Sequence, residues 1–252
     1  MAAVVIEPRF QGFQGIALGG YVGGLLARGG AAEVRLLRPA PIGRPLSVEE
    51  RADGTTALLD GENALALARP TDLDLPVPAP VLAEEARTAA RGYPGFQRHL
   101  FPGCFVCGPE RREGDGLRIF PGLVPERGVV AAPWVPDASL AGPDGNVAPE
   151  FVWSAVDCPS IWPLIYGAPP GSRERVVTAR LGLRPVAPVP VGAPCVVTGW
   201  AVGGDGRFRV AGAAVRSAEG RLLAVARHTL APAEWGVPLD PGVWGLNGRE
   251  TV

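Results

Sequence analysis

The chain has 252 residues, of which 47% are hydrophobic and 19% are charged, enough to build a substantial core. Glycine (35) and proline (28) make up about a quarter of the sequence, but the abundance of aliphatic residues argues against disorder. A net charge of −1 offers no basic excess for nucleic acid, and the absence of lysine excludes Schiff-base and P-loop chemistry.

The beginning of the chain, MAAVVIEPRF, has neither the basic region nor the apolar run of a signal peptide. No stretch approaches the roughly 20 apolar residues needed to cross a bilayer. Four cysteines are too few for a disulfide-stabilised secreted fold of this length. We therefore expect a cytoplasmic protein without a membrane segment.

The first predicted helix covers residues 19–28 (GGYVGGLLAR) and is apolar on nearly all sides. Each glycine costs a helix about 1 kcal/mol relative to alanine, so this composition indicates a buried helix in very close contact with its neighbours. Residues 46–54 and 55–71 follow as alternating apolar runs separated by Asp-Gly turns. These patterns predict antiparallel hairpins.

Residues 70–115 are rich first in proline and then in glutamate, alanine and arginine. They predict a linker with one surface helix at residues 83–91. The linker ends in CFVCGP at residues 104–109 and GDGLRI at residues 114–119.

The second apolar helix is predicted at residues 149–165 (PEFVWSAVDCPSIWPLI). Proline suits the first turn of a helix, and Glu150 favours the positive end of its dipole. Pro159 and Pro163 are expected to kink or end this helix. Alternating runs at residues 195–206, 208–220 and 221–232 predict further antiparallel strands.

An internal repeat organises these elements. The tripeptide Leu-Arg-Pro occurs at residues 37–39 and again at 183–185, followed by Pro-Ile-Gly at 41–43 and Pro-Val-Gly at 190–192. Each tripeptide follows an apolar helix and precedes a meander of strands. The pattern predicts an α+β fold, a double hotdog in which an antiparallel sheet wraps around one buried helix in each repeat. The expected divisions are repeats at residues 1–80 and 116–235, a linker at 81–115 and a tail at 236–252.

This order resembles the double-hotdog acyl-CoA thioesterases over about residues 10–68 and 116–232. The CxxCG segment and the following Gly-Leu look like the segment that heads many single-hotdog thioesterases. In thioesterases of this type, an acid in the second-half helix works with a hydroxyl and an amide side chain. The resemblance implies that Asp157 is the acid and Thr178 the hydroxyl, with His228 in the place of the amide.

Asp157 stands in an apolar helical stretch, where an unpaired carboxylate is costly. It would orient water or act as a general base, although an acid near a helix end could instead face solvent. His228, whose ordinary pKa is near 6.5, would donate to the thioester oxygen or act as a base. Its position in an alternating strand also suits a hydrogen-bonded core histidine.

Other residues are candidates for binding the substrate. Hotdog enzymes use helix N-terminal amides as an oxyanion hole, which the resemblance assigns to Gly19 and Gly20. Tyr21 and Gln14 would line the same pocket. Aromatic residues of the second helix would form either core or an acyl tunnel: Phe151, Trp153, Trp162 and Tyr166. Surface arginines would suit the phosphates of CoA if they gather at the pocket mouth: Arg111, Arg112, Arg118, Arg173 and Arg175.

The CxxC pair, Cys104 and Cys107, lacks the second matching pair that a zinc ribbon needs, so no metal is expected. A tight turn that positions glycine is the preferred interpretation. Cys158 is interpreted as a buried inert thiol, and His99 as structural or exposed. The first helix carries no acid, which predicts one active site rather than two.

We therefore expect an enzyme that hydrolyses an acyl thioester of CoA or of a carrier protein, without a cofactor. A hotdog hydratase or dehydratase is the alternative enzyme. A non-catalytic acyl-CoA or lipid-binding protein is the alternative outside enzymology. A homodimer is expected because hotdog sheets commonly pair at their edges.

Overall fold

The computed structural model describes residues 2–166 and 176–232. The predicted tail at 236–252, and Arg173 and Arg175, lie outside the described residues. No helix in the described ranges is long and apolar enough to cross a membrane.

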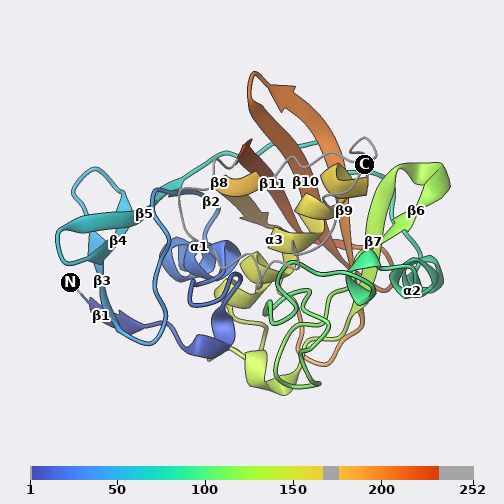
Figure 1. The fold of residues 1–252 in the computed structure, drawn as a ribbon, viewed down its shortest axis with the longest axis horizontal. Helices are drawn as coiled ribbons and strands as arrows, with labels where there is room; N and C mark the ends of the chain where they lie inside the picture. Colours follow the sequence, from blue (N-terminus) through green and yellow to red (C-terminus); the bar gives the residue numbers. More distant parts are fainter. Residues whose placement is uncertain (1, 167–175, 233–252) are drawn as a thin grey trace, which may run out of the picture.

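Eleven strands form one antiparallel sheet in the order β1-β3-β4-β5-β2-β8-β11-β10-β9-β7-β6 (Figure 1). The strands are β1 (Ala2–Val5), β2 (Ala32–Leu36), β3 (Pro45–Glu50), β4 (Thr56–Asp60), β5 (Asn63–Pro70), β6 (Gly122–Val124), β7 (Val129–Trp134), β8 (Val176–Pro185), β9 (Cys195–Asp205), β10 (Phe208–Ser217) and β11 (Leu222–Pro232). The sheet joins the two halves of the chain through β2 and β8, where Val34 lies opposite Leu181. The predicted α+β class and the hairpins of both halves are confirmed.

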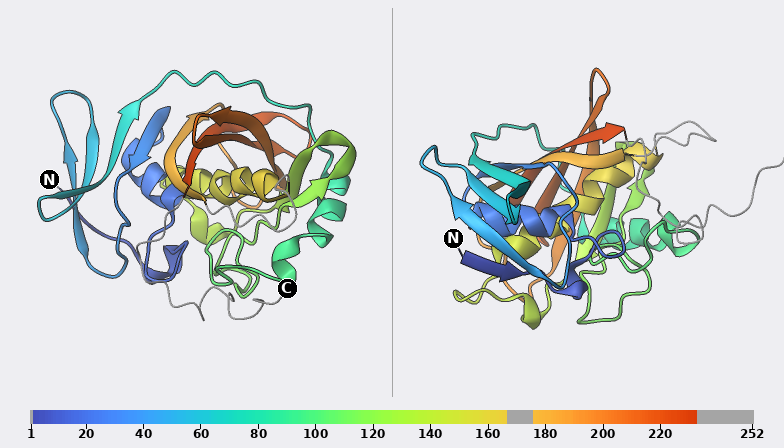
Figure 2. Two further views of the ribbon diagram at one scale, coloured as in Figure 1. Left: turned by 45° about the horizontal axis from the view of Figure 1, so that its top comes forward. Right: turned by 60° about the vertical axis from the view of Figure 1, so that its left-hand side comes forward.

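Two buried helices, α1 (Gly19–Ala27) and α3 (Pro149–Tyr166), lie against each other and against the sheet (Figures 1 and 2). Glycines make their close approach possible. A Cβ atom on Gly20 would lie 2.6 Å from the Trp153 carbonyl oxygen, and one on Gly24 would lie 2.2 Å from the Glu150 Cα atom. The glycine-rich face of the first helix therefore serves helix–helix contact.

Helix α3 continues through both internal prolines to Tyr166, within one residue of the predicted bounds, so of the two expected effects, a kink or an end, neither proline ends it. Pro163 has no N–H, and therefore the Pro159 carbonyl receives no helical hydrogen bond. This carbonyl packs instead on β9, where a Cβ atom on Gly199 would lie 1.9 Å from its oxygen. Burial on nearly every side outweighs the local preference of proline to break the helix.

The linker packs against the sheet and is hydrogen-bonded to it. After β5 it crosses over the sheet to α2 (Ala83–Arg91), which has the predicted bounds and packs beside β6 and β7 (Figure 2). Leu73, Leu75 and Val81 form a second apolar cluster with strand residues on this side of the sheet. Arg184 and Arg216 bind linker carbonyls at Leu73 and Pro78.

The backbones of the two halves make matching hydrogen bonds before and after each buried helix. Four short 3-10 turns occur among the described residues, and two of them, η1 (Pro8–Phe10) and η4 (Ala138–Leu140), precede α1 and α3 at corresponding places. Before the helices, the bond from Leu18 N–H to Phe10 O matches the bond from Ala148 N–H to Leu140 O. After the helices, the bond from Leu37 N–H to Leu65 O matches the bond from Val186 N–H to Leu223 O. These pairs set each helix in the same relation to its own strands.

Candidate active site

Asp157 lies in the third turn of α3 and is only 3% exposed. Its Oδ2 atom accepts a hydrogen bond of 2.7 Å from the backbone N–H of Gly20, in the first turn of α1. The first N–H groups of a helix have no partner within the helix, and the helix dipole favours a negative charge there. The carboxylate thus joins the two halves of the chain at a position suited to anions.

His228 and Thr178 meet beside this carboxylate. His228 is fully buried on β11, and its Nε2 atom lies 2.8 Å from Thr178 Oγ1 on the neighbouring strand β8. The Nδ1 atom lies 3.9 Å from Asp157 Oδ1. The structure therefore brings together the three side chains that the sequence resemblance assigned to catalysis.

A fourth polar residue, Ser160, was not indicated by the sequence patterns. Its hydroxyl donates to the Asp157 backbone carbonyl at 2.6 Å and lies 2.6 Å from His228 Nδ1. Because the single hydroxyl proton is used on the carbonyl, Ser160 accepts from Nδ1–H, and Nε2 is left to accept from Thr178. The available signal was spacing, since Ser160 follows Asp157 by about one helical turn.

Burial acts in opposite directions on the two ionisable groups. It raises the pKa of Asp157 to about 7, although the Gly20 N–H favours the charged form. It lowers the pKa of His228 to about 3. The 3.9 Å separation of the two side chains would suit an ion pair, but a ring with so low a pKa is neutral at pH 7. The contact is therefore between a carboxyl group and a neutral imidazole.

Gly19 lies beside these groups in tight packing. A Cβ atom at this residue would lie 3.4 Å from Asp157 Oδ2, 3.7 Å from Thr178 Oγ1 and 2.8 Å from Leu36 Cδ1. Gly19, Leu36 and Thr178 are partly exposed, whereas Asp157 and His228 are buried behind them. The absence of a side chain at Gly19 therefore lets α1 lie in close contact with Leu36, beside the carboxylate.

The other predicted pocket residues make their contacts elsewhere. Tyr21 stacks on Phe10 with ring centroids 4.3 Å apart. The Trp153 ring packs on Gly23 of α1. Trp162 and Gln14 also lie apart from this group, the first in an edge contact with Tyr93 and the second exposed in the loop before α1.

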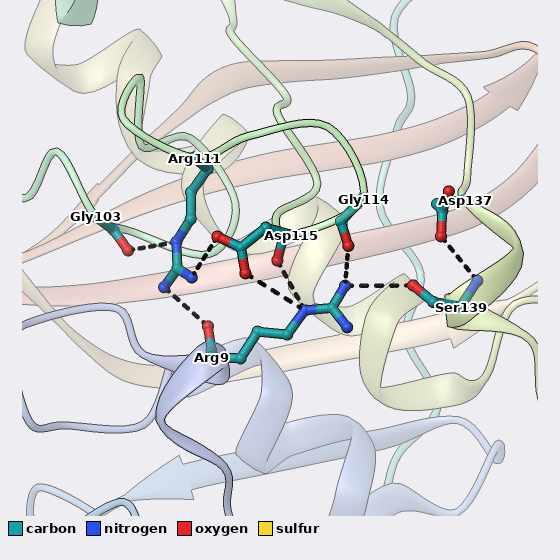
Figure 3. Close-up of polar contacts among 7 residues, drawn as sticks. All are labelled: Arg9, Gly103, Arg111, Gly114, Asp115, Asp137 and Ser139. Carbon is teal, nitrogen blue, oxygen red and sulfur yellow. Dashed lines mark hydrogen bonds and ion pairs between the residues drawn. The ribbon is translucent and has the colours of Figure 1, made fainter.

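Among the described arginines of the predicted phosphate-binding set, Arg111 and Arg118 are in contact, since the Arg118 guanidinium donates to the Arg111 carbonyl. Arg111 donates to Asp115 and to the carbonyls of Gly103 and Arg9, so it holds the loop before β6 in place (Figure 3). Arg118 lines a hollow of ≈ 490 Å³ together with Arg9. Arg112 is exposed.

Comparisons with known proteins extend this description. No protein-family model and no curated protein sequence matches the chain. The structure is similar to a candidate thioesterase II from Thermobifida fusca YX, with 17% identity, a TM-score of 0.56, and coverage of 92% of this chain and 93% of that chain. A candidate thioesterase from Novosphingobium aromaticivorans DSM 12444 gives 13% identity, a TM-score of 0.55, and coverage of 92% and 94%.

The tesB protein of Mycobacterium avium subs paratuberculosis gives 13% identity, a TM-score of 0.54, and coverage of 87% of this chain and 88% of that chain. At these identities the likeness establishes a shared fold. The large antiparallel sheet with few helices is consistent with the hotdog fold.

Proposed function

We propose that this chain hydrolyses acyl thioesters of CoA or of a carrier protein, as a double hotdog with repeats at residues 1–80 and 116–235. The observation that carries the proposal is the buried Asp157 carboxylate, bound to Gly20 N–H beside Thr178 and His228. The similar structures, described as thioesterases or candidates, support it through their fold. A homodimer stays a prediction.

In the proposed reaction Asp157 takes a proton from water while the water oxygen attacks the thioester carbonyl carbon. The carbon–sulfur bond then breaks, and the proton passes to the departing thiolate, leaving a carboxylic acid and a free thiol. A pKa of about 7 suits a general base at neutral pH, because the base must be ionised yet still basic.

Thr178 and His228 orient the water. The Thr178 hydroxyl donates to His228 Nε2, so its oxygen remains free to accept a hydrogen from the attacking water. The 2.8 Å contact would also suit a threonine nucleophile activated by histidine. A histidine with a pKa of about 3 is a weak base, and this difference favours Asp157.

The helix N-terminus polarises the carbonyl of the substrate. Gly20 N–H is already bound to Asp157, so the N–H of Gly19 is the donor that we assign to the developing oxyanion. This revises the expectation that both amides contact the substrate.

Thiol release from short, long, branched and aromatic acyl-CoA substrates tests the proposal. Wild type should release thiol, and Asp157→Asn should lose about 10²–10⁴-fold of the rate. Asp72→Asn, which changes an exposed linker carboxylate, is the matched control and should retain the rate.

Two other outcomes would contradict hydrolysis. Loss of enoyl absorbance without thiol release would indicate a hydratase. Binding of acyl-CoA without either reaction would indicate a non-catalytic protein.

A further inference from the structure

Three cysteine sulfurs meet between the linker and α3. The Sγ atoms of Cys104, Cys107 and Cys158 all lie within 4.8 Å of one another. Cys104 Sγ is 3.6 Å from Cys158 Sγ and 3.8 Å from Cys107 Sγ. All three residues are buried and none forms a disulfide. Cys158 is buried, as the sequence interpretation expected, but α3 also brings it to the CxxC pair, which that interpretation did not include.

The CxxC turn points donors at sulfur. The backbone N–H groups of Val106 and Cys107 are directed at Cys104 Sγ, and Gly108 N–H donates to the Cys104 carbonyl at 3.0 Å. A Cβ atom on Gly108 would lie 2.5 Å from that carbonyl oxygen, so only glycine fits here. The turn thereby fixes the backbone between Cys104 and Cys107, whose sulfurs lie 3.8 Å apart.

His99 adds a donor to the second sulfur. Its Nδ1 atom accepts from Phe101 N–H at 2.9 Å, which assigns the ring proton of the neutral form to Nε2. The Nε2 atom lies 3.3 Å from Cys107 Sγ and can donate to it. His99 is therefore a hydrogen-bond partner of the sulfur cluster rather than one of its ligand atoms.

The sulfur spacing fits a tetrahedral ion. Metal–sulfur bonds of about 2.3 Å place two sulfur ligands about 3.8 Å apart, close to the two sulfur–sulfur distances of 3.6 and 3.8 Å. Soft thiolate ligands select zinc-like ions over magnesium or calcium.

We propose that Cys104, Cys107 and Cys158 bind one thiophilic metal ion of the zinc class as three thiolates, with a small solvent ligand in the fourth position. The ion fastens the linker to α3 at the residue next to Asp157. Binding displaces the three thiol protons to solvent, and no oxidant or reductant takes part. This proposal is independent of the proposed hydrolysis, because its test measures metal.

Metal content is the first test. Wild-type protein is reduced, incubated with Zn²⁺ and desalted. Elemental mass spectrometry should then find about one zinc per chain. Cys104→Ser and Cys107→Ser should retain almost none. Cys195→Ser is the matched control, since Cys195 is buried outside the cluster and donates to the Ala193 carbonyl. It should retain zinc at the wild-type level.

Cobalt provides a second test, made first on the wild-type protein. Replacement of zinc by Co²⁺ in wild type should give sulfur-to-cobalt charge-transfer absorption and the visible bands of four-coordinate cobalt. His99→Gln should retain the metal, and complete loss would make His99 a ligand and overturn the three-thiolate set.

Absence of zinc and of the cobalt bands from reduced wild type would overturn the proposal. So would zinc retained by both Cys104→Ser and Cys107→Ser. A disulfide between Cys104 and either neighbour, found in metal-free protein purified without reductant, would identify the cluster as a redox pair instead.

Discussion

At the scale of single residues, the proposed chemistry depends on a carboxyl group that is expensive to bury. The pKa of Asp157 is raised from 3.8 to about 7 by desolvation, so the native state favours its protonated form. The unfolded chain releases this proton at lower pH than the native chain does. The contribution of Asp157 to stability is therefore full below about pH 4 and is lost as the pH rises to about 7.

Asp157→Asn is expected to stabilise the protein while it removes activity. At pH 8 the free energy of unfolding should rise by about 1–3 kcal/mol, because a buried charge is replaced by a neutral group that can still accept from Gly20. Below pH 4 the gain should disappear. Urea denaturation of both proteins at pH 4 and pH 8 measures it, and lower stability of the variant at pH 8 would contradict the assigned ionisation.

The pH dependence of catalysis should follow the same group. Since Asp157 acts as a base, kcat/KM should rise with pH and level off above about pH 7. His228, with its pKa lowered to about 3, should add no step near pH 6.5. Rates measured from pH 5 to pH 9 check this, and a rate that falls as the pH rises through this range would contradict Asp157 as the base.

Ser160 is expected to position His228 rather than to touch the substrate. Ser160→Ala removes one hydrogen-bond partner of the ring, which should cost about 1 kcal/mol of stability and weaken the preference of the ring for this tautomer. Nitrogen NMR of labelled histidine distinguishes this role from simple packing. Wild type should show protonated Nδ1, and an unchanged tautomer in the variant would refute the role.

At the scale of secondary-structure elements, the glycine face of α1 sets its distance from α3. Gly24→Ala would gain about 1 kcal/mol of helix propensity but would place Cβ 2.2 Å from the Glu150 backbone. The clash with backbone should dominate, so we expect lower thermal stability. The separated helices should also lengthen the Gly20–Asp157 bond and raise the midpoint of the pH–rate profile further.

Gly30→Ala is the control, because its Cβ would meet only the Ala27 carbonyl oxygen at 3.7 Å. Wild-type thermal stability and pH profile are expected for it. If Gly24→Ala had the thermal stability and pH profile of this control, the glycine contacts would not determine the distance between α1 and α3 or the length of the Gly20–Asp157 bond.

The hydrophobic periodicity and the positions of glycine and proline in turns predicted the elements well, because both are local properties of the sequence. Helices α1, α2 and α3 lie within a residue of their predicted bounds. The partners of Ser160 and Cys158 could not be predicted this way, since both depend on where α3 meets residues distant in the chain. The way in which α3 accommodates Pro163 could not be predicted either, because the Pro159 carbonyl that it leaves without a helical hydrogen bond packs on Gly199 of another element.

At the scale of the whole molecule, the matching hydrogen bonds relate the halves residue by residue. They pair Leu18 with Ala148 and Leu65 with Leu223, which makes Ala27 the counterpart of Asp157 and Pro70 the counterpart of His228. The second position thus lacks both the acid and the imidazole. One catalytic site per chain stays the prediction, for the reason already given by the absence of an acid in the first helix.

A non-hydrolysable thioether analogue of acyl-CoA should accordingly bind with a stoichiometry of about one per chain in a calorimetric titration, whatever the oligomeric state. Asp72→Asn should give the same value. Two equivalent sites per chain would contradict the assignment of Ala27 and Pro70 as an inactive counterpart.

The bond between Gly20 and Asp157 spans 137 residues of the chain. Contacts of such long sequence separation form late in folding, after each local meander has closed. Forming them earlier would cost more conformational entropy, because a long disordered segment would have to be closed into a loop. A complete but half-folded polypeptide therefore carries Asp157, Thr178 and His228 before the acid has met the Gly20 amide that orients it. Catalytic competence would appear only when the second half has docked on the first, which makes turnover a sensitive reporter of complete maturation.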